Sequence, residues 1–373
     1  MQAPANPSLA IQGTPIVLLG ASVRSAAESI RRAGCGHVVA IDQFGDSETL
    51  RATDSWLPLP SVDRNNLEAK LHAAGTRGGR LLISGGIYGG YEEWRESPMG
   101  FVGAAPEVFQ QTDCPVFLKE LARASEVGFP ETTSRVSVAS QWPTTGWLVK
   151  RRKSCGGVGV EFFVGKELDS GEYLQRRQRG RVLGATFVAD EHGAELVGVC
   201  GLLTKRVHPR PFLFAGAIGP LRLIDSVLCR IAAIGSALMQ RVPIQGPFNI
   251  DVVITGDHVT LLEVNPRWSA SMEVLERSWM QRLDRPCSFF EPADGWRRRL
   301  RESKEGPVFW KRVIYARRDM EVSPQQFQDS SPRWEWTDTP SDVTIVEKGS
   351  PIATMIRRPH QRSKAFRISI REG

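Results

Sequence analysis

The stretch FNIDVVITGDHV, residues 248–259, is followed at 261–271 by LLEVNPRWSAS, and together they indicate the fold. In the first half polar and apolar residues alternate, which is typical of a strand with one buried face. The polar face of that strand carries Asn249 and Asp251, and Glu263 and Asn265 share a face of the returning segment. The two segments therefore predict an antiparallel hairpin whose end holds a carboxylate, an amide and the arginine Arg267.

The length of the connecting loop decides whether the two polar sets meet. A two-residue loop at 256–257 would pair Asp251 with Leu262 and turn Glu263 to the opposite face. A three-residue loop at 256–258 would pair Asp251 with Glu263 and would also bring the two asparagines opposite each other. We predict the second register, because it gathers two carboxylates and two amides on one surface.

Oxygen ligands concentrated in this way suit a Mg²⁺ ion that bridges a polyphosphate. Asp251 and Glu263 repel each other and need a cation nearby, and Arg267 lies two residues beyond Asn265. The alternative is a solvated sheet face followed by an Asn-Pro turn, and this segment alone leaves both interpretations open.

A second hairpin is predicted around a glycine-rich loop. Lys150 ends the apolar segment GWLVKRR at 146–152, and KSCGGVGV follows at 153–160. Backbone N–H groups of such a loop can approach phosphate oxygens closely, and a lysine beside it supplies a positive charge. An ordinary hairpin turn would have the same composition, so the loop is weak evidence by itself.

Composition and charge exclude several classes of protein. The net charge of +7 is spread along the chain, and the interleaved aromatics of a single-strand nucleic-acid binder are missing, so we expect no nucleic-acid partner. The six cysteines form no C-x-x-C pair that would suggest zinc or a disulfide framework. No apolar run approaches the roughly 20 residues of a membrane span. Without a secretory signal, the cytoplasm is the expected compartment.

The N-terminal third predicts a parallel sheet. TPIVLLG at 14–20 is an uninterrupted apolar run closed by glycine, typical of a strand buried on both faces. A helix should follow between an N-cap at Ser22 and a stop at Gly34, and then a second strand at 37–43. This βαβ unit lacks G-x-G-x-x-G, so we predict no dinucleotide site.

From about residue 115 the pattern changes to helices and paired antiparallel strands, with strands expected at 181–189, 195–204, 246–254 and 258–264. We therefore divide the chain into an α/β domain at 1–114, an α+β domain with antiparallel sheets at 115–305, and a small strand-rich segment at 306–373.

Taken in this order, the lysine strand, glycine loop and carboxylate hairpin resemble the ATP-grasp superfamily of carboxylate–amine and carboxylate–thiol ligases. FAGAIGP at 214–220 and RWSASMEV at 267–274 also look like that family. The resemblance covers most of the chain. The N-terminal third is similar to a pre-ATP-grasp domain of a subgroup described as predicted carboligases, and the C-terminal piece to that of biotin-carboxylase relatives.

The resemblance implies a role for particular residues. Lys150 would hold phosphates of ATP, and Arg267 would hold the substrate carboxylate or its acylphosphate. Mg²⁺, or Mn²⁺, would bind Asp251, Glu263 and Asn265. The flap over the nucleotide would consist of Ser154, Gly156, Gly157 and Gly159, and the adenine-binding hinge would start at Gln175 and continue through Arg176 and Arg177.

The sequence departs from the family pattern at one phosphate contact. ATP-grasp enzymes usually carry an Asp-Lys pair before the first helix of the domain, and this chain has Asp113-Cys114. Either Lys119, a turn and a half later, replaces the lysine or one contact is lost. The arginine-rich hinge is a second unusual feature, which we interpret as a solvated face rather than an anion site.

If the resemblance holds, the protein joins a small-molecule carboxylate to an amine at the expense of ATP, and a homodimer is possible, as in many relatives. Two alternatives stay open: a carboligase that activates bicarbonate, and a degenerate protein that binds nucleotide without turnover. No residue is an obvious nucleophile or base. The weak candidates are Glu273, the acids Glu92 and Glu93, and the histidines His208 and His258.

Overall fold

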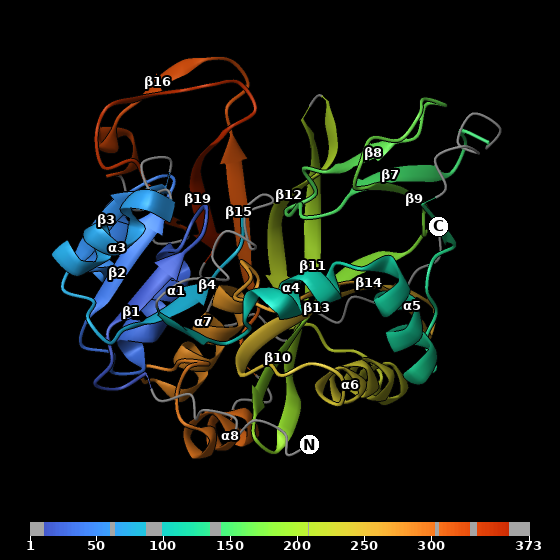
Figure 1. The fold of residues 1–373 in the computed structure, drawn as a ribbon, viewed down its shortest axis with the longest axis horizontal. Helices are drawn as coiled ribbons and strands as arrows, with labels where there is room; N and C mark the ends of the chain where they lie inside the picture. Colours follow the sequence, from blue (N-terminus) through green and yellow to red (C-terminus); the bar gives the residue numbers. More distant parts are fainter. Residues whose placement is uncertain are drawn as a thin grey trace.

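The computed structural model describes residues 11–59, 64–86, 99–134, 143–207, 209–302, 306–328 and 334–357. Three of the four sheets contain most of the strands in these residues. A parallel N-terminal sheet lies beside the C-terminal strands, a large antiparallel sheet forms the middle, and a small sheet projects on the far side (Figure 1). The predicted fold class, a parallel-sheet domain followed by a domain with antiparallel sheets, is confirmed.

The N-terminal sheet has the order β3-β2-β1-β4-β5, and all its pairs are parallel. Its strands are β1 (Ile16–Leu19), β2 (Val38–Asp42), β3 (Ser55–Pro58), β4 (Arg80–Ile83) and β5 (Gly100–Val102), and its helices are α1 (Arg24–Arg32), α2 (Ser47–Ala52), α3 (Arg64–Ala73) and α4 (Pro106–Thr112). All four residues of β1 are fully buried, as the apolar run predicts. The carboxyl ends of β1 and β4 lead to glycines, which becomes important at the site.

The first helix starts differently from the prediction. Its N-cap is Val23 and not Ser22, and no side chain of the cap residue bonds the first turn. The carboxylate of Asp42 accepts the Val23 N–H at 3.3 Å, so the end of β2 satisfies a helix donor that the sequence assigned to a serine. The predicted stop at Gly34 is confirmed, because this residue follows the helix with a φ of +90°.

The small sheet has the order β6-β9-β7-β8 and holds the glycine-rich hairpin. It comprises β6 (Thr132–Thr133), β7 (Trp147–Arg151), β8 (Val160–Phe162) and β9 (Glu172–Arg176), and it follows α5 (Pro115–Ala124). Its own core consists of Trp147, Val149, Phe163, Leu168 and Leu174. The hairpin β7–β8 is antiparallel, as predicted.

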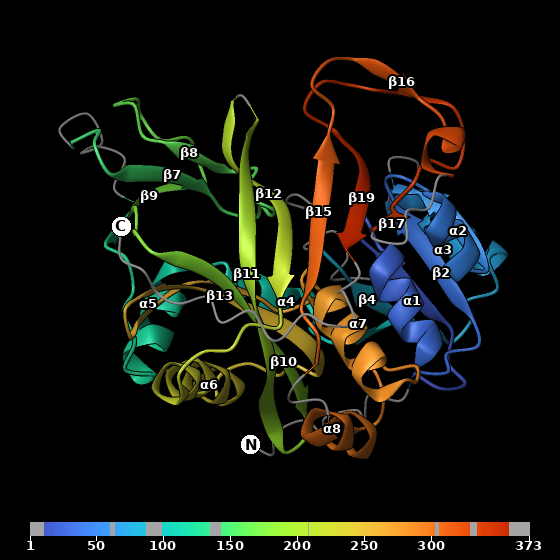
Figure 2. The same cartoon turned by 180° about the vertical axis from the view of Figure 1, so that it is seen from behind.

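The large sheet has eight strands in the order β14-β13-β10-β11-β12-β15-β19-β17. They are β10 (Arg181–Asp190), β11 (Gly193–Val207), β12 (Arg210–Gly219), β13 (Gly246–Thr255), β14 (His258–Asn265), β15 (Phe309–Tyr315), β17 (Trp334–Thr337) and β19 (Pro351–Arg357). The last three come from the C-terminal segment, and β15 and β19 run side by side next to β12 (Figure 2). The C-terminal segment thus continues the sheet of the preceding domain. The ribbon of β16 (Met320–Val322) and β18 (Thr344–Val346) and the turn η3 (Pro324–Phe327) project from it.

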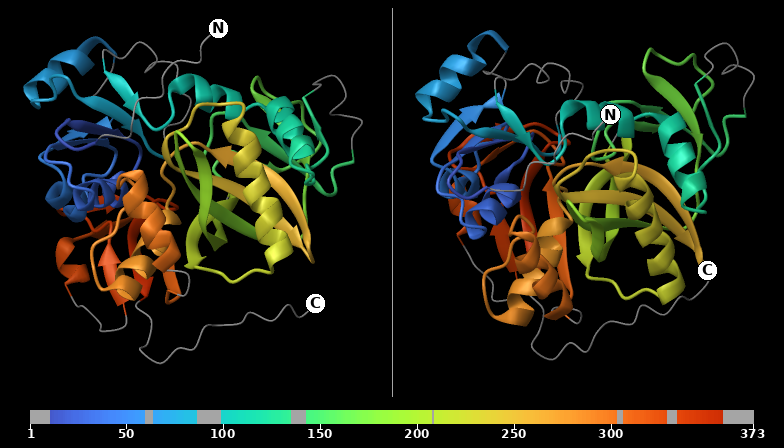
Figure 3. Two further views of the ribbon diagram at one scale, coloured as in Figure 1. Left: turned by 90° about the horizontal axis from the view of Figure 1, so that it is seen from below. Right: turned by 60° about the horizontal axis from the view of Figure 1, so that its bottom comes forward.

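Helices cover the large sheet on both faces. α6 (Asp225–Met239) packs on one face beside α5, as the view from below shows (Figure 3). On the other face α7 (Met272–Leu283) lies between the sheet and the N-terminal domain, and α8 (Ala293–Glu302) lies below α7 in the view of Figure 2. The structure has two large hydrophobic cores, one that includes α6 and one that includes α7 and α8. The alternating residues of β1 contribute to both: Val17 and Leu19 pack in the core with α6, and Ile16 and Leu18 pack in the core with α7 and α8. The N-terminal sheet is therefore packed firmly against the rest of the chain.

Candidate functional site

The hairpin of β13 and β14 has the predicted register. Asp251 pairs with Glu263, and Asn249 pairs with Asn265. The apolar face of β13 is buried as expected, with Phe248, Ile250 and Val252 fully buried. Two carboxylates and two amides consequently share one surface of the large sheet.

The hairpin reaches this register by another route than the predicted one. Thr255 pairs with His258, so the loop has two residues and the predicted three-residue loop is wrong. Val252 pairs with Leu261 while Asp251 pairs with Glu263, so Leu262 is an extra residue in a β-bulge. The bulge shifts the register by one residue and returns Glu263 to the face of Asp251.

Amide groups connect the two carboxylates. The Asn249 Nδ2 donates to Asp251 Oδ1 at 2.6 Å. The Asn265 Nδ2 donates to Asp251 Oδ2 at 3.4 Å and to Glu263 Oε1 at 3.2 Å. The carboxylates therefore face each other across one amide, close enough to share a cation.

The pKa values of Asp251 and Glu263 are shifted in opposite directions. Burial and the negative charge of Glu263 raise the pKa of Asp251 well above its usual range. The pKa of Glu263 is lowered: burial opposes ionisation, but the charge of Lys150 and hydrogen bonds from Asp251 and Asn265 outweigh it. The pair thus favours a state in which it binds one proton and carries one negative charge. A bound cation would take the place of that proton.

Lys150 lies opposite this pair, on β7. Its Nζ is 3.7 Å from Glu263 Oε2. Burial would lower the pKa of Lys150, but interactions with Tyr173, Glu263 and Asp251 raise it, so the ammonium stays charged. Tyr173, which the sequence analysis did not single out, is the ladder partner of Lys150 on β9 and is buried. A bulky residue opposite a lysine carries no sequence signal of its own.

The glycine-rich loop is folded down onto β12. The Ser154 hydroxyl donates to the Arg151 carbonyl oxygen at 2.8 Å, and the Arg151 N–H donates to Gly159 O at 2.8 Å. At Gly157, where φ is +76°, an added Cβ would come within 2.0 Å of the Phe212 carbonyl oxygen. This close approach of two backbones requires glycine and fixes the loop over the large sheet.

The hinge residues occupy three different environments. Gln175 is buried and its Nε2 donates to Thr132 Oγ1 at 3.3 Å, so its side chain is engaged within the small sheet. The Arg176 guanidinium lies 5.5 Å from the ring of Trp147. The Arg177 guanidinium lies 5.6 Å from the ring of Phe162, and both arginines are exposed. The side chains of the hinge therefore pack on aromatic rings, and a base would have to meet the backbone after Gln175.

Arg267 links the hairpin to the N-terminal domain. Its Nη2 donates to Asn265 Oδ1 at 2.8 Å and its Nη1 to the Trp268 carbonyl oxygen at 3.1 Å. A Cβ added at Gly85, just beyond β4, would come within 2.7 Å of Arg267 Nη1. The guanidinium thus lies against the carboxyl edge of the parallel sheet, where ligands of α/β proteins commonly bind.

The departure at Asp113-Cys114 has a structural counterpart. Asp113 Oδ2 accepts the Lys153 N–H at 2.9 Å and so fixes the base of the glycine-rich loop. Cys114 is the N-cap residue of α5, and its side chain supplies no positive charge. Lys119 is exposed on that helix. The acid of the expected Asp-Lys pair therefore keeps a structural role without its lysine.

Comparison with known proteins identifies this architecture. A family model described as an ATP-grasp domain matches residues 116–271, which hold the lysine strand, the loop, the hinge and the carboxylate hairpin. Residues 116–271 form an ATP-grasp domain. The predicted ATP-grasp domain is thereby confirmed for this part of the chain. A comparison with curated protein sequences gave no match.

Solved structures share the fold of the chain around the ATP-grasp domain. A protein from Archaeoglobus fulgidus, described as belonging to the same superfamily, is 16% identical with a TM-score of 0.57, over 90% of this chain and 100% of its own. N5-carboxyaminoimidazole synthetase from Staphylococcus aureus, solved with ADP, is 12% identical with a TM-score of 0.65, over 94% and 95%. Phosphoribosylglycinamide synthetase from Anaerococcus prevotii is 15% identical with a TM-score of 0.58, over 92% and 93%. At these identities the likeness concerns the fold alone.

The hairpin of the ATP-grasp domain fits a magnesium ion that is shared with a ligand. Among the described residues no group of three or more histidines, cysteines or acids could enclose a metal, and the hairpin supplies two carboxylates. Mg²⁺ usually binds through one or two carboxylates together with phosphates and water. The Asn265 amide oxygen now accepts from Arg267, and a half-turn of that amide would present the oxygen to the ion.

Several candidate residues do not reach the site of the ATP-grasp domain. Glu273 is buried in an ion cluster, where its carboxylate accepts from Arg24 at 2.6 and 2.8 Å and from Lys311 at 2.7 Å, so its candidacy as a base is wrong. The His258 side chain is 82% exposed at the hairpin tip, where His258 is the first residue of β14. Glu92, Glu93 and His208 lie outside the described residues.

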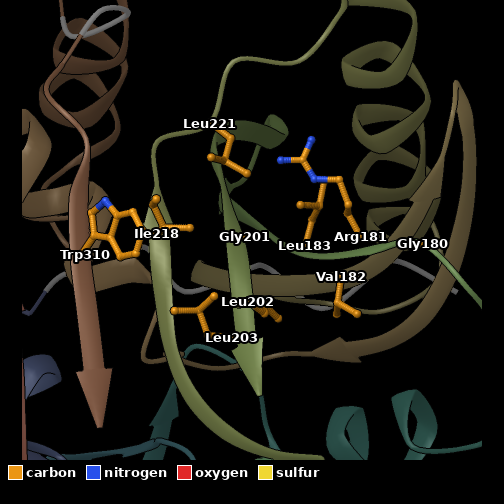
Figure 4. A pocket seen from close by; sticks show the side chains of 10 residues that line it. All are labelled: Gly180, Arg181, Val182, Leu183, Gly201, Leu202, Leu203, Ile218, Leu221 and Trp310. Atoms are coloured by element: carbon orange, nitrogen blue, oxygen red, sulfur yellow. The ribbon is translucent and has the colours of Figure 1, made fainter. Parts of the chain in front are cut away.

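A cavity of about 520 Å³ lies along the strands of the large sheet. Leu183, Gly201, Ile218 and Trp310 form one row across four strands and line it (Figure 4). The next row joins Gly184 to Asp251, and neighbouring rows of a sheet point to opposite faces. The side chains of the first row therefore point away from Asp251, and neither Asp251 nor Glu263 lines the cavity. Elsewhere, none of the described helices combines the length and apolar character needed to cross a bilayer.

Proposed function

We propose that the protein is an ATP- and Mg²⁺-dependent ligase that activates a carboxylate as an acylphosphate and joins it to an amine, releasing ADP and phosphate. The observation that carries this proposal is the position of Lys150, 3.7 Å from a carboxylate pair that is short of positive charge. A lysine, two acids and a glycine-rich loop around one space suit a nucleoside triphosphate with its cation.

Each residue of the site then has a defined task. Lys150 and the N–H groups of the loop at 154–159 hold the phosphates, and the charge of Lys150 stabilises the negative charge that develops during transfer. Asp251, Glu263 and Asn265 would hold the magnesium ion, which would supply positive charge to neutralise the phosphates. Arg267 fixes the substrate carboxylate beside Gly85, so that one of its oxygens points at the γ-phosphorus.

The bonds formed and broken balance with these groups alone. A carboxylate oxygen attacks the γ-phosphorus while the bond to the bridging oxygen breaks, and ADP leaves. The amine nitrogen then attacks the acyl carbon, the bond to phosphate breaks, and the amine loses a proton to water or to the departing phosphate. No protein nucleophile is needed, in agreement with the absence of an obvious one.

A second candidate uses bicarbonate as the carboxylate. One protein of the same fold is named for a carboxyamino product, and the arginine site beside Gly85 is compatible with a small planar anion. A ligase of either type should transfer one ¹⁸O atom from the labelled carboxylate to phosphate. ADP release that requires added bicarbonate would favour the second candidate.

The first experiment is a calorimetric titration of the protein with ADP, with and without Mg²⁺, since it requires no knowledge of the substrate. We expect micromolar, magnesium-dependent binding that Glu263→Ala abolishes. Asp257→Ala, an exposed acid in the turn of the same hairpin, is the matched control and should bind normally. Absence of binding in the wild-type protein would contradict the proposal.

As part of this proposal, the partners are small-molecule carboxylate and amine substrates, without nucleic acid or membrane, in the cytoplasm. Self-association into a homodimer is a further expectation, which sedimentation would test.

A further inference from the structure

The missing lysine at Cys114 leaves the nucleotide site one cation short of the family pattern. Lys119 is exposed on α5. A replacement has to come from a cation that lies next to Asp113, because the acid of the pair is retained.

Arg152 meets this requirement. It lies two residues after Lys150, in the turn that directly follows β7 and leads into the glycine-rich loop. Its Nε is 3.4 Å from Asp113 Oδ2, the oxygen that also accepts the Lys153 N–H. The Arg152 N–H donates to the Gly171 carbonyl oxygen at 2.9 Å, which fixes the backbone at this point.

The guanidinium of Arg152 has donors to spare. An arginine carries five N–H donors. The Nε of Arg152 is buried without a hydrogen-bond partner, and within the described part of the chain the long ion pair with Asp113 is the interaction found for this side chain. The neighbouring Arg151 faces the other way and donates to Glu172 at 2.9 Å. Arg152 is thus held in place and is not saturated.

Asp113 and Arg152 belong to the same electrostatic neighbourhood as the carboxylate hairpin. The charges of Arg152 and Glu263 both influence the pKa of Asp113, which burial raises. The charges of Lys150, Glu263 and Asp113 likewise act on Tyr173, whose pKa burial raises. The geometry agrees, because Asp113 contacts Arg152 and also holds the base of the glycine-rich loop at Lys153.

We propose that Arg152, positioned by Asp113, binds nucleotide phosphates in this ATP-grasp domain and replaces the cation that Cys114 does not supply. The inference rests on the proposed function, since it assumes that nucleotide binds between the loop and the hairpin. It replaces both earlier alternatives, a role for Lys119 and a lost contact. A guanidinium can donate two N–H groups to a phosphate while its Nε keeps the ion pair with Asp113.

The test is a calorimetric titration of the full-length protein with MgADP and, separately, with adenosine. Arg152→Ala should weaken MgADP binding about 10- to 100-fold and leave adenosine binding unchanged, because adenosine has no phosphate. Arg151→Ala and Lys119→Ala are matched controls that remove a nearby positive charge and should retain the wild-type affinity. Thermal unfolding of each variant reports whether the fold persists, and Arg152→Gln replaces Arg152→Ala if the latter does not fold.

A rescue experiment separates binding from a merely structural role. The double variant Cys114→Lys with Arg152→Ala restores the family arrangement and should recover most of the lost MgADP affinity. Wild-type binding of MgADP that Arg152→Ala leaves unchanged would overturn the inference while the proposed function stands. A loss caused by Lys119→Ala instead would assign the contact to Lys119. No MgADP binding by the wild-type protein would overturn the inference and the proposed function together.

Discussion

Asp251 and Glu263 are direct partners in the β13–β14 ladder, and an extra residue, Leu262, brings them there. The bulge compensates for a loop that is one residue shorter than the register needs. Two acids on one face, linked by the Asn265 amide, are unfavourable without a cation. The backbone pairing of this hairpin thus places two acids where a positively charged ligand would stabilise them.

This preference predicts a trade-off between stability and binding at Asp251. In the absence of nucleotide, Asp251→Asn should raise the melting temperature at pH 8 and have little effect at pH 5. The folded-state pKa of this acid is raised above its unfolded value, so its ionisation destabilises the folded protein as the pH rises. The same variant should bind MgADP at least about tenfold more weakly.

Thermal melts at the two pH values and MgADP titrations check this prediction. Asp257→Asn, exposed in the turn, serves as the control and should change neither quantity. An equal effect of Asp251→Asn at pH 5 and pH 8 would contradict the account of the pair.

Gly157 and Gly156 provide a matched test of the loop over the site. Both have positive φ, of +76° and +60°, but a Cβ at Gly157 would meet the Phe212 carbonyl oxygen at 2.0 Å, whereas nothing lies within 4 Å of one at Gly156. Gly157→Ala should therefore lift the loop from β12 and weaken MgADP binding more than tenfold. Gly156→Ala should cost about 1 kcal/mol of stability and little affinity. Similar affinities for both variants, measured by calorimetry, would argue against a role for the closed loop.

Gly85 should control the chemical step rather than nucleotide binding. A Cβ at this position would approach Arg267 Nη1 to 2.7 Å, and the guanidinium would have to move. We expect Gly85→Ala to reduce turnover about 10- to 100-fold, once a substrate is known, while the Kd for MgADP changes less than threefold. Gly100→Ala, which has no neighbour within 4 Å, is the control for a glycine change in the same domain. A parallel loss of nucleotide affinity would place Arg267 on the phosphates instead.

Glu273 should contribute to stability and not to catalysis. It is buried between Arg24, Lys311 and Arg277, and although burial alone would raise its pKa, their charges hold it well below the usual range. Glu273→Gln leaves these cations uncompensated and should destabilise the protein by about 3–5 kcal/mol at pH 7. Arg285→Ala breaks a half-exposed ion pair with Glu302 and should cost less than about 1 kcal/mol.

The pH dependence gives the sign of this effect. The folded-state pKa of Glu273 is depressed, so its contribution is present above the unfolded pKa of about 4.3 and disappears as the pH falls below it. The difference in stability between wild type and Glu273→Gln, measured by denaturant unfolding, should therefore shrink on acidification below about pH 4. A difference that grows at low pH would contradict this account.

Part of the site could be predicted because it depends on one hairpin. The alternation at 248–255 places Asn249 and Asp251 on one face whatever the rest of the chain does, and the pairing with Glu263 was predicted for the wrong reason. Loop length and bulge are interchangeable ways to reach one register, and a single sequence does not distinguish them. The prediction of an N-cap at Ser22 was wrong for a similar reason, since Asp42 on another strand accepts the Val23 N–H.

The sequence by itself determined the local elements: the buried strand at 16–19, the glycine-rich loop after Lys150 and the carboxylate face of β13. These follow from side-chain alternation and backbone freedom, which operate over a few residues. The tertiary structure decided which distant groups meet, namely Arg152 with Asp113, Arg267 with Gly85 and Glu273 with Arg24. Such contacts depend on how the sheets pack on one another, and no local pattern in the chain encodes that packing.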